Sequence, residues 1–222
     1  MSPDATVFIV DDDHAVRESL QRLIESTNMR AETFPDGRRF LEHYDPSRPG
    51  CLLLDIRMRG MDGLELQDVL RRAGAAIPVI IISAHGNVEQ VVRAMKAGAV
   101  HFVQKPYKAK VLLTHVRDAL ELDARLRLAA AQRTAATERL RSLTPREREV
   151  LDLLVTGMPA KRVAAELGLS RKTVDVHRGH IMLKLGAESI IELGQLVQRS
   201  RAADVRPGLA PGPLVDQPPP IH

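Results

Sequence analysis

Short apolar runs alternate with amphipathic stretches along the first half of the chain. The apolar runs predict five buried strands, at residues 6–10, 30–34, 51–55, 78–83 and 100–104. Apolar residues at helical spacing predict helices at residues 14–27, 36–43, 64–73, 88–97 and 109–122. Strands joined by helices at this spacing form right-handed βαβ units, which place a buried parallel sheet between two helical layers. The predicted fold is therefore α/β, a (βα)5 doubly wound domain of the flavodoxin-like type over residues 1–122.

The second half of the chain has a helical pattern. Residues 123–141 are rich in Ala, Leu and Arg and contain neither Gly nor Pro, so we predict a helical linker that continues the preceding helix. Four short helices are predicted within an all-α domain at residues 142–203, beginning near Pro145, Pro159, Arg171 and Ser189. The glycine-containing turn in AAELGLSRKTV is typical of a helix-turn-helix. The Pro-rich residues 204–222 are predicted to be disordered.

Composition and charge narrow the class of protein. An apolar content of 44% with 27% charged residues fits a soluble globular chain. We expect a cytoplasmic protein, because Cys51 is the one cysteine, no apolar run is long enough to span a membrane, and the first residues do not resemble a signal peptide. The net charge is −1 for residues 1–122 and +5 for residues 123–222. This asymmetry favours a slightly acidic domain that carries out a chemical reaction, joined to a basic domain that binds a polyanion.

Acidic and polar side chains stand where the predicted strands end. Asp11 and Asp12 follow the first strand, Asp55 ends the third, Ser83 ends the fourth and Lys105 follows the fifth. Because the carboxyl ends of parallel strands share one edge of a sheet, we expect these side chains to converge. Clustered carboxylates suit Mg²⁺, and with a hydroxyl and an ammonium group they provide what phosphoryl transfer to a carboxylate requires. Each residue alone is more commonly a solvated surface group, so the inference depends on the whole set.

The set Asp11-Asp12, Asp55, Ser83-Ala84 and Lys105-Pro106 resembles the receiver domain of two-component response regulators, over roughly residues 4–122. The resemblance implies that Asp55 is the phosphoacceptor, which takes a phosphoryl group from a sensor histidine kinase. It implies that Lys105 and Ser83 contact that group. It also implies a Mg²⁺ cofactor, held by the carboxylates of Asp11, Asp12 and Asp55 and by the backbone carbonyl of Arg57.

The same resemblance bears on three further positions. Phe102 matches an aromatic switch whose rotamer reports phosphorylation, although an ordinary core phenylalanine explains this residue equally well. Arg59 stands where the family usually has proline, in a loop that keeps Gly60 and Gly63. Asp13 is not a primary metal ligand in the family, and we expect it to cap the helix that follows.

Residues 143–186 resemble the LuxR-type helix-turn-helix of the NarL/FixJ response regulators, and the match extends to about Val197. The surrounding residues are basic, as a DNA-binding surface requires. DNA contacts are therefore predicted for Lys161, Arg171, Lys172, Thr173, Asp175, Val176, His177, Arg178 and Lys184. Two interpretations of Asp175 remain, because its carboxylate suits either a cytosine amine or the positioning of a neighbouring arginine. For His177, contact with the DNA backbone and packing are both open.

Together these features predict a phosphorylation-dependent transcriptional regulator of the FixJ-like subset, which binds promoter DNA. Phosphorylation of Asp55 would shift dimerisation and promoter binding, with a homodimer as the phosphorylated form. We expect no membrane partner, and no enzyme activity beyond weak self-dephosphorylation at Asp55. The alternative is a haloacid-dehalogenase-like Mg²⁺-dependent phosphohydrolase, because Asp11-x-Asp13, Ser83 and Lys105 imitate its motifs. That enzyme needs an acidic pair soon after the lysine, which PYKAKVLLTH lacks, and it gives no reason for a helix-turn-helix.

Overall fold

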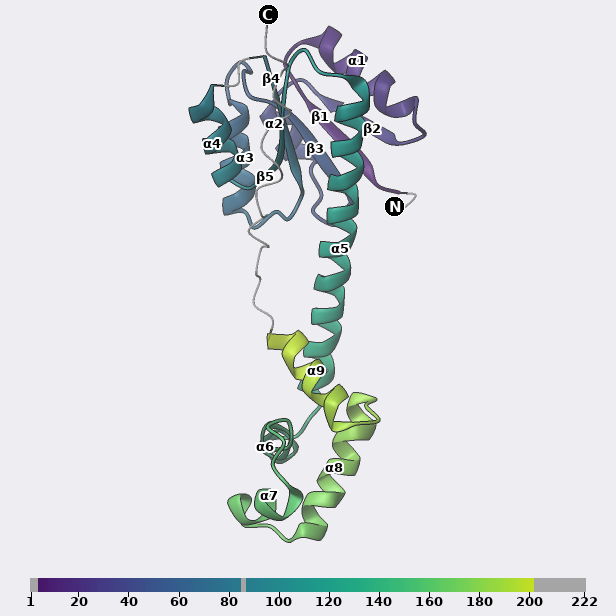
Figure 1. Ribbon diagram of the computed structural model, residues 1–222, viewed down its shortest axis with the longest axis vertical. Helices are drawn as coiled ribbons and strands as arrows, with labels where there is room; N and C mark the ends of the chain where they lie inside the picture. Colours follow the sequence, from purple (N-terminus) through teal and green to yellow (C-terminus); the bar gives the residue numbers. More distant parts are fainter. Residues whose placement is uncertain (1–3, 85–86, 202–222) are drawn as a thin grey trace, which may run out of the picture. The chain divides into compact units, whose positions relative to one another are not determined.

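The chain forms two compact units (Figure 1). The computed structural model describes residues 4–84 and 87–201. The units divide between Arg127 and Leu128, inside one long helix. The tail predicted to be disordered, residues 204–222, lies outside the described residues. Within the described ranges, no helix is both long enough and apolar enough to cross a membrane.

The N-terminal unit contains a parallel sheet of five strands. These are β1 (Thr6–Val10), β2 (Arg30–Phe34), β3 (Gly50–Asp55), β4 (Val79–Ser83) and β5 (Ala99–Gln104). The strand order is β2-β1-β3-β4-β5, and Val10 of β1 lies opposite Phe34 on one side and Leu54 on the other. This is the predicted flavodoxin-like topology. Because the order reverses beside β1, the residues after β1 and β3 line the crevice where ligands bind in such sheets.

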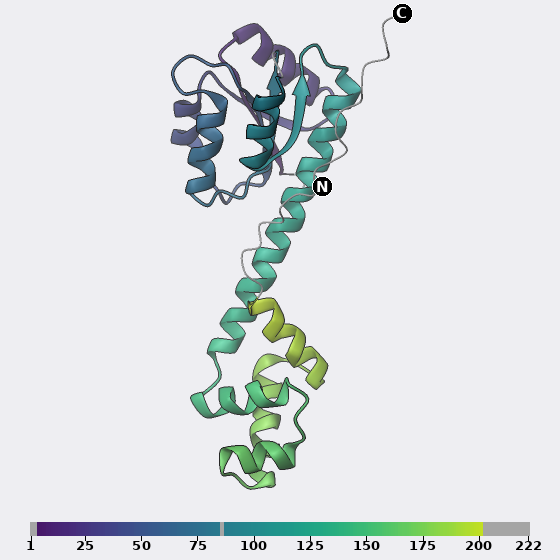
Figure 2. The same ribbon diagram turned by 60° about the vertical axis from the view of Figure 1, so that its left-hand side comes forward.

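Helices cover both faces of this sheet (Figure 2). They are α1 (His14–Glu25), α2 (Gly37–His43), α3 (Gly63–Arg72), α4 (Val88–Lys96) and the first turns of α5 (Ala109–Arg141). On one face, α1 and α5 bury Ile24 and Leu112 against strand residues that include Cys51, which is a core residue as predicted. On the other face, α2, α3 and α4 pack around Phe40 and Leu66. Each such side chain contributes about 1.5–3 kcal/mol when fully buried, so these two layers stabilise the sheet edge that carries the site.

Short polar side chains start several of these helices. Asp13 accepts hydrogen bonds from the backbone N–H groups of Ala15 and Val16, which confirms its predicted capping role. Asp62 caps α3 in a reciprocal capping box with Glu65. Such caps satisfy N–H groups that the first helical turn leaves without partners, and each is worth about 1 kcal/mol.

Helix α5 continues beyond the sheet without a break, as the composition of residues 123–141 predicts. The sequence places the end of the first domain at residue 122, but contacts of the next turn extend the N-terminal unit to Arg127. Buried Asp123 accepts a hydrogen bond of 2.9 Å from the backbone N–H of Gly50 at the start of β3. The Arg127 guanidinium binds the Asp123 carboxylate at 2.8 Å and donates to the carbonyls of Pro46, Ser47 and Arg48. Asp123 and Arg127 therefore fasten α5 to the loop before β3.

The C-terminal unit is all helical, as predicted. After the last turns of α5 it contains α6 (Pro145–Leu154), α7 (Ala160–Leu167), α8 (Arg171–Leu185) and α9 (Ile190–Arg201). Their apolar faces share one core with Val150, Val163, Ile181 and Leu193 at its centre. Gly168 ends α7 and Gly186 ends α8 in the left-handed conformation, where glycine has no steric penalty. The turn from Gly168 to Ser170, the N-cap of α8, sets α7 and α8 as a helix-turn-helix.

Candidate functional site

The predicted polar residues gather at the carboxyl edge of the sheet. Asp11 directly follows β1 and Asp55 ends the neighbouring β3, and both are nearly buried, at 3% and 8% exposed. Lys105, which follows β5, places its Nζ 3.0 Å from Oδ2 of Asp11 and 2.8 Å from Oδ1 of Asp55. In the chain, Lys105 lies 94 positions after Asp11 and 50 positions after Asp55, yet its ammonium group contacts both carboxyl groups. The structure places these three predicted residues together.

The ends of β4 and β5 are joined beside this ammonium group. The backbone N–H of Lys105 donates to the carbonyl of Ser83 at 2.8 Å, and the Lys105–Pro106 peptide bond is cis. The Ser83 side chain is buried at the end of β4. Ser83 and Lys105 therefore lie on adjacent strand ends, where the sequence predicts that both contact a phosphoryl group.

Burial and charge act against each other in this cluster. Desolvation raises the pKa of the Asp55 carboxyl group, and the hydrogen bond and positive charge of Lys105 offset this only in part. Burial alone would lower the pKa of the Lys105 ammonium, but its contacts with Asp55 and Asp11 raise that pKa overall. Two carboxylates therefore share one fully charged lysine, and a third carboxylate, that of Asp12, stands exposed beside them. The cluster carries excess negative charge that a cation would neutralise.

Two backbone donors in this site are not evident from the sequence. The N–H of Arg59 donates to Oδ2 of Asp12 at 3.2 Å, a bond that the usual proline at this position could not make because it has no N–H. The N–H of Asp13 donates to Oδ1 of Asp11 at 2.9 Å. The Arg17 guanidinium also donates to the Asp11 carbonyl at 2.6 Å. Burial raises the pKa of the half-buried Tyr107, while the charge of Lys105 lowers it and that of Asp11 raises it. Arg17 and Tyr107 are neighbours of the site that the motifs did not indicate.

The helix-turn-helix presents a basic and polar face on α7 and α8. Val174, Ile181 and Leu185 are buried in the domain core. Side chains on the rest of α8 are exposed or half-buried, and these include Arg171, Lys172, Thr173, Asp175, Val176, His177 and Arg178. Val176 is 49% exposed on this face of α8. Lys161 and Arg162 are exposed on α7.

Comparisons with known proteins agree with this geometry. Residues 7–117 match the response regulator receiver domain family, and residues 141–197 match the luxR family of bacterial regulatory proteins. The chain is 42% identical over 194 residues to Nodulation protein W of Bradyrhizobium diazoefficiens, which covers 86% of this chain and 85% of that protein. It is 36% identical over 202 residues to the transcriptional regulatory protein FixJ of the same organism, with 90% and 98% of the two chains covered. The chain belongs to the FixJ-like response regulators.

Solved structures of such response regulators support the same assignment. The structure of the response regulator StyR superposes with a TM-score of 0.80 at 44% identity and covers 88% of this chain and 99% of that one. Full-length FixJ from B. japonicum gives a TM-score of 0.55 at 34% identity, with 89% and 97% covered. The predicted family, fold and function as a transcriptional response regulator are confirmed. A receiver joined to a DNA-binding domain is a signalling protein, and the phosphohydrolase alternative has no support.

For the other predicted site residues, the structure shows where the side chain lies but does not assign its role. Phe102 is half-buried on β5 and packs against the core on the side of α3 and α4, which fits a switch and a core residue alike. The backbone N–H of Arg57 hydrogen-bonds to Asp55, and its side chain is exposed. Arg171 and Asp175 form an exposed pair at 3.9 Å, which favours the interpretation of Asp175 as a residue that positions an arginine.

Lys184 has a structural partner that the sequence did not indicate. Its Nζ donates to Oε2 of the buried Glu147 at 2.7 Å, while Glu147 also closes the predicted capping box with Thr144. The bond to Lys184, followed by the backbone N–H of Thr144, lowers the pKa of the Glu147 carboxyl group to about 2. The Lys184 charge therefore joins α8 to α6, and phosphate contact by this residue stays a prediction.

Glu147→Gln is expected to destabilise the C-terminal unit by about 2 kcal/mol at pH 7, because a charge-assisted hydrogen bond to Lys184 is lost. The folded pKa of Glu147 lies below its ordinary value of 4.5, so this stabilisation is complete above pH 4.5 and disappears as the pH falls through about 2. Urea unfolding followed by far-UV circular dichroism at several pH values measures the difference. Glu149→Gln, which removes an exposed carboxylate of the same helix, is the control. A pH-independent difference would contradict this assignment.

Gly63→Ala is expected to destabilise the receiver by about 1–3 kcal/mol and to slow phosphorylation, because an added Cβ would lie 2.1 Å from the backbone carbonyl oxygen of Asp55. The N–H of Gly63 holds this close approach by a 2.9 Å bond to Ile56. Thermal unfolding monitored by tyrosine fluorescence reports the effect. In the same loop Gly60→Ala meets no atom within 4 Å and carries only the penalty of a positive φ, so phosphorylation should persist in that variant. Equal phosphorylation rates in Gly63→Ala and wild type would contradict the expectation that the added Cβ displaces the backbone of Asp55.

Proposed function

We propose that this response regulator accepts a phosphoryl group on Asp55 from a sensor histidine kinase. The observation that carries the proposal is the contact of one ammonium group, that of Lys105, with both Asp11 and Asp55 at the carboxyl edge of the sheet. A carboxylate oxygen of Asp55 would attack the phosphorus atom as the P–N bond of the kinase phosphohistidine breaks. The bonding electrons stay on the imidazole nitrogen, which takes up a proton from solvent. Lys105 would then pair with the phosphoryl oxygens, and Ser83 would hydrogen-bond to them.

A divalent cation fits the same cluster. Asp11, Asp12 and Asp55 supply oxygen ligands only. Two of these side chains, Asp11 and Asp55, share one lysine, and Asp12 next to Asp11 is exposed, so negative charge is left to be neutralised. These residues and the Arg57 carbonyl would hold Mg²⁺, which when bound neutralises charge on the transferring phosphoryl group. The Arg59 N–H orients Asp12 and leaves other lone pairs of that carboxylate for the cation.

The C-terminal unit would bind promoter DNA through α7 and α8. The exposed cations Lys161, Arg171, Lys172 and Arg178 would contact phosphates, while Thr173, Asp175, Val176 and His177 are candidates for contact with bases or neighbouring backbone. The pairing of Lys184 with Glu147 makes Lys184 the weakest candidate of the set. Phosphorylation would favour a homodimer that reads a pseudo-palindromic site, and slow hydrolysis of the Asp55 acyl phosphate would reset the protein. We place this activity in the cytoplasm.

The test uses the full chain and two conditions. Acetyl phosphate should phosphorylate the wild type in the presence of Mg²⁺ and leave it unmodified when EDTA replaces Mg²⁺. The association constant of the treated chain for duplex DNA is measured by fluorescence anisotropy. Its logarithm should fall linearly with the logarithm of the salt concentration, with a slope of about −0.9 for each phosphate contacted. Phosphorylation that is independent of Mg²⁺, or DNA binding that is insensitive to salt, would contradict the proposal.

A further inference from the structure

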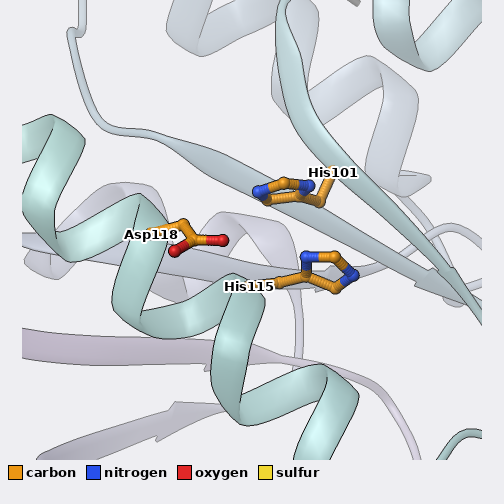
Figure 3. Close-up of side chains that lie close together, drawn as sticks. All are labelled: His101, His115 and Asp118. Carbon is orange, nitrogen blue, oxygen red and sulfur yellow. The ribbon is translucent and has the colours of Figure 1, made fainter. Parts of the chain in front are cut away.

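A second cluster of ligating side chains lies away from the acidic edge, where β5 meets α5. His101 of β5 and His115 of α5 have stacked imidazole rings, with centroids 4.1 Å apart and an interplanar angle of 29°. Asp118, one helical turn after His115, points its carboxylate toward the edges of these rings (Figure 3). One ligand atom from each of the three residues lies within 4.8 Å of the others. No other group of three such residues in the described ranges meets this criterion.

The backbone of β5 is distorted in a way that brings His101 to this position. The pairing of β4 with β5 shifts register between Val79 and Ile80, whose partners are Ala99 and His101, so Val100 is an extra residue. Val100 packs in the core layer that contains α5, and the next residue, His101, stacks on His115 of that same helix. Consecutive strand residues normally face opposite sides of a sheet. The bulge thus turns the His101 side chain toward α5, which is what bulges beside functional sites commonly do.

Both imidazoles are half-buried. Burial lowers the pKa of His101, and the neighbouring His115 lowers it further, with Asp118 acting in the opposite direction. Burial also lowers the pKa of His115. A lowered pKa favours the neutral imidazole, the form that has a lone pair for a metal ion. Nδ1 of His115 is buried and has no hydrogen-bond partner among the described residues, so stacking alone leaves a polar atom unsatisfied.

We propose that His101, His115 and Asp118 bind a divalent transition-metal ion of the Zn²⁺ class. Two imidazoles and one carboxylate are the donor set of open zinc sites, in which solvent or another ligand fills the fourth position. Ligand atoms in such a site are about 3.4 Å apart, as Zn–N bonds of about 2.05 Å dictate, so the two rings would rotate out of the stacked arrangement to point their lone pairs at one ion. The all-oxygen cluster at Asp11, Asp12 and Asp55 prefers Mg²⁺, and the two sites therefore select different ions.

A bound ion would join two elements of the receiver. His101 stands on the strand that also carries Phe102 and leads to Lys105, while His115 and Asp118 belong to the helix that continues into the C-terminal unit. The ion would hold β5 against α5 and stabilise the folded receiver by mass action.

The experiment titrates Zn²⁺ into the untagged full chain in the presence of excess Mg²⁺, with binding measured by isothermal calorimetry. Wild type should bind one Zn²⁺ per chain, and His101→Gln and His115→Gln should each weaken binding at least tenfold. Asp118→Asn should weaken it by a smaller factor. His43→Gln removes an exposed imidazole of the same unit and should bind as wild type does.

Two further measurements separate loss of the site from loss of the fold. Melting temperatures in EDTA should be similar for all variants. Zn²⁺ should raise the melting temperature of the wild type and of His43→Gln equally, raise that of Asp118→Asn by less, and raise those of the two histidine-site variants least. Co²⁺ in place of Zn²⁺ should give a visible absorption band that the double variant His101→Gln/His115→Gln lacks. Absence of Zn²⁺ binding by the wild type would overturn the proposal, as would equal Zn²⁺ affinity in the double variant.

Discussion

Asp55→Asn is expected to abolish phosphorylation of the chain by acetyl phosphate, and by any cognate kinase, in the presence of Mg²⁺. The substitution keeps the size and shape of the side chain but replaces the nucleophilic carboxylate with an amide. It also removes one of the two carboxylates that position Lys105, whose remaining bond to Asp11 is 3.0 Å long.

The matched control for this prediction is Asp68→Asn. Asp68 lies on α3 and pairs with Arg71 at the surface, away from the strand ends, so its loss should leave phosphorylation unchanged. Intact-mass spectrometry before and after treatment measures the modified fraction of each variant. Equal modification of Asp55→Asn and wild type would show that another residue is the acceptor.

Arg127→Ala is expected to destabilise the receiver by about 3 kcal/mol. It would leave the buried Asp123 carboxylate without its counter-charge, and it would remove the donors to the carbonyls of the loop before β3. The chain has two tyrosines, Tyr44 and Tyr107, and no tryptophan, so tyrosine fluorescence in urea follows the N-terminal unit alone. Arg125→Ala, an exposed change two positions earlier on α5, should shift stability by less than about 0.5 kcal/mol. Equal midpoints for the two variants would contradict the structural role of Arg127.

Local pattern and motif spacing predicted most of this molecule. β1, β3 and β4 are fully buried runs bounded by turn residues, and the parallel order of the sheet places Asp11, Asp55, Ser83 and Lys105 at one edge whatever the details of packing. The DNA-binding unit was predictable for a similar reason, since Thr144, Gly168 and Ser170 are short-range signals for helix ends.

What the sequence did not reveal depends on long-range partners. Asp123 is a buried acid within the helical linker, and its partner is the backbone N–H of Gly50, 73 residues earlier. Lys184 carries the charge expected of a DNA contact, but Glu147, 37 residues earlier, binds it. The orientation of His101 depends on a register shift that periodicity cannot indicate. In each case the position of the residue depends on a contact with a distant part of the chain, which no local sequence pattern indicates.

The central claim is that phosphorylation at Asp55 controls DNA binding by the other unit. The direct test begins by selecting one DNA duplex from a random-sequence pool with the acetyl-phosphate-treated wild type. The dissociation constant of the protein for this duplex is then measured before and after the protein is treated with acetyl phosphate and Mg²⁺. Coupling between two sites typically amounts to a factor of about 5–150, so treatment should tighten wild-type binding at least about fivefold. It should leave the dissociation constant of Asp55→Asn unchanged. Equal tightening in Asp55→Asn, or a fully phosphorylated wild type with unchanged affinity, would contradict the claim.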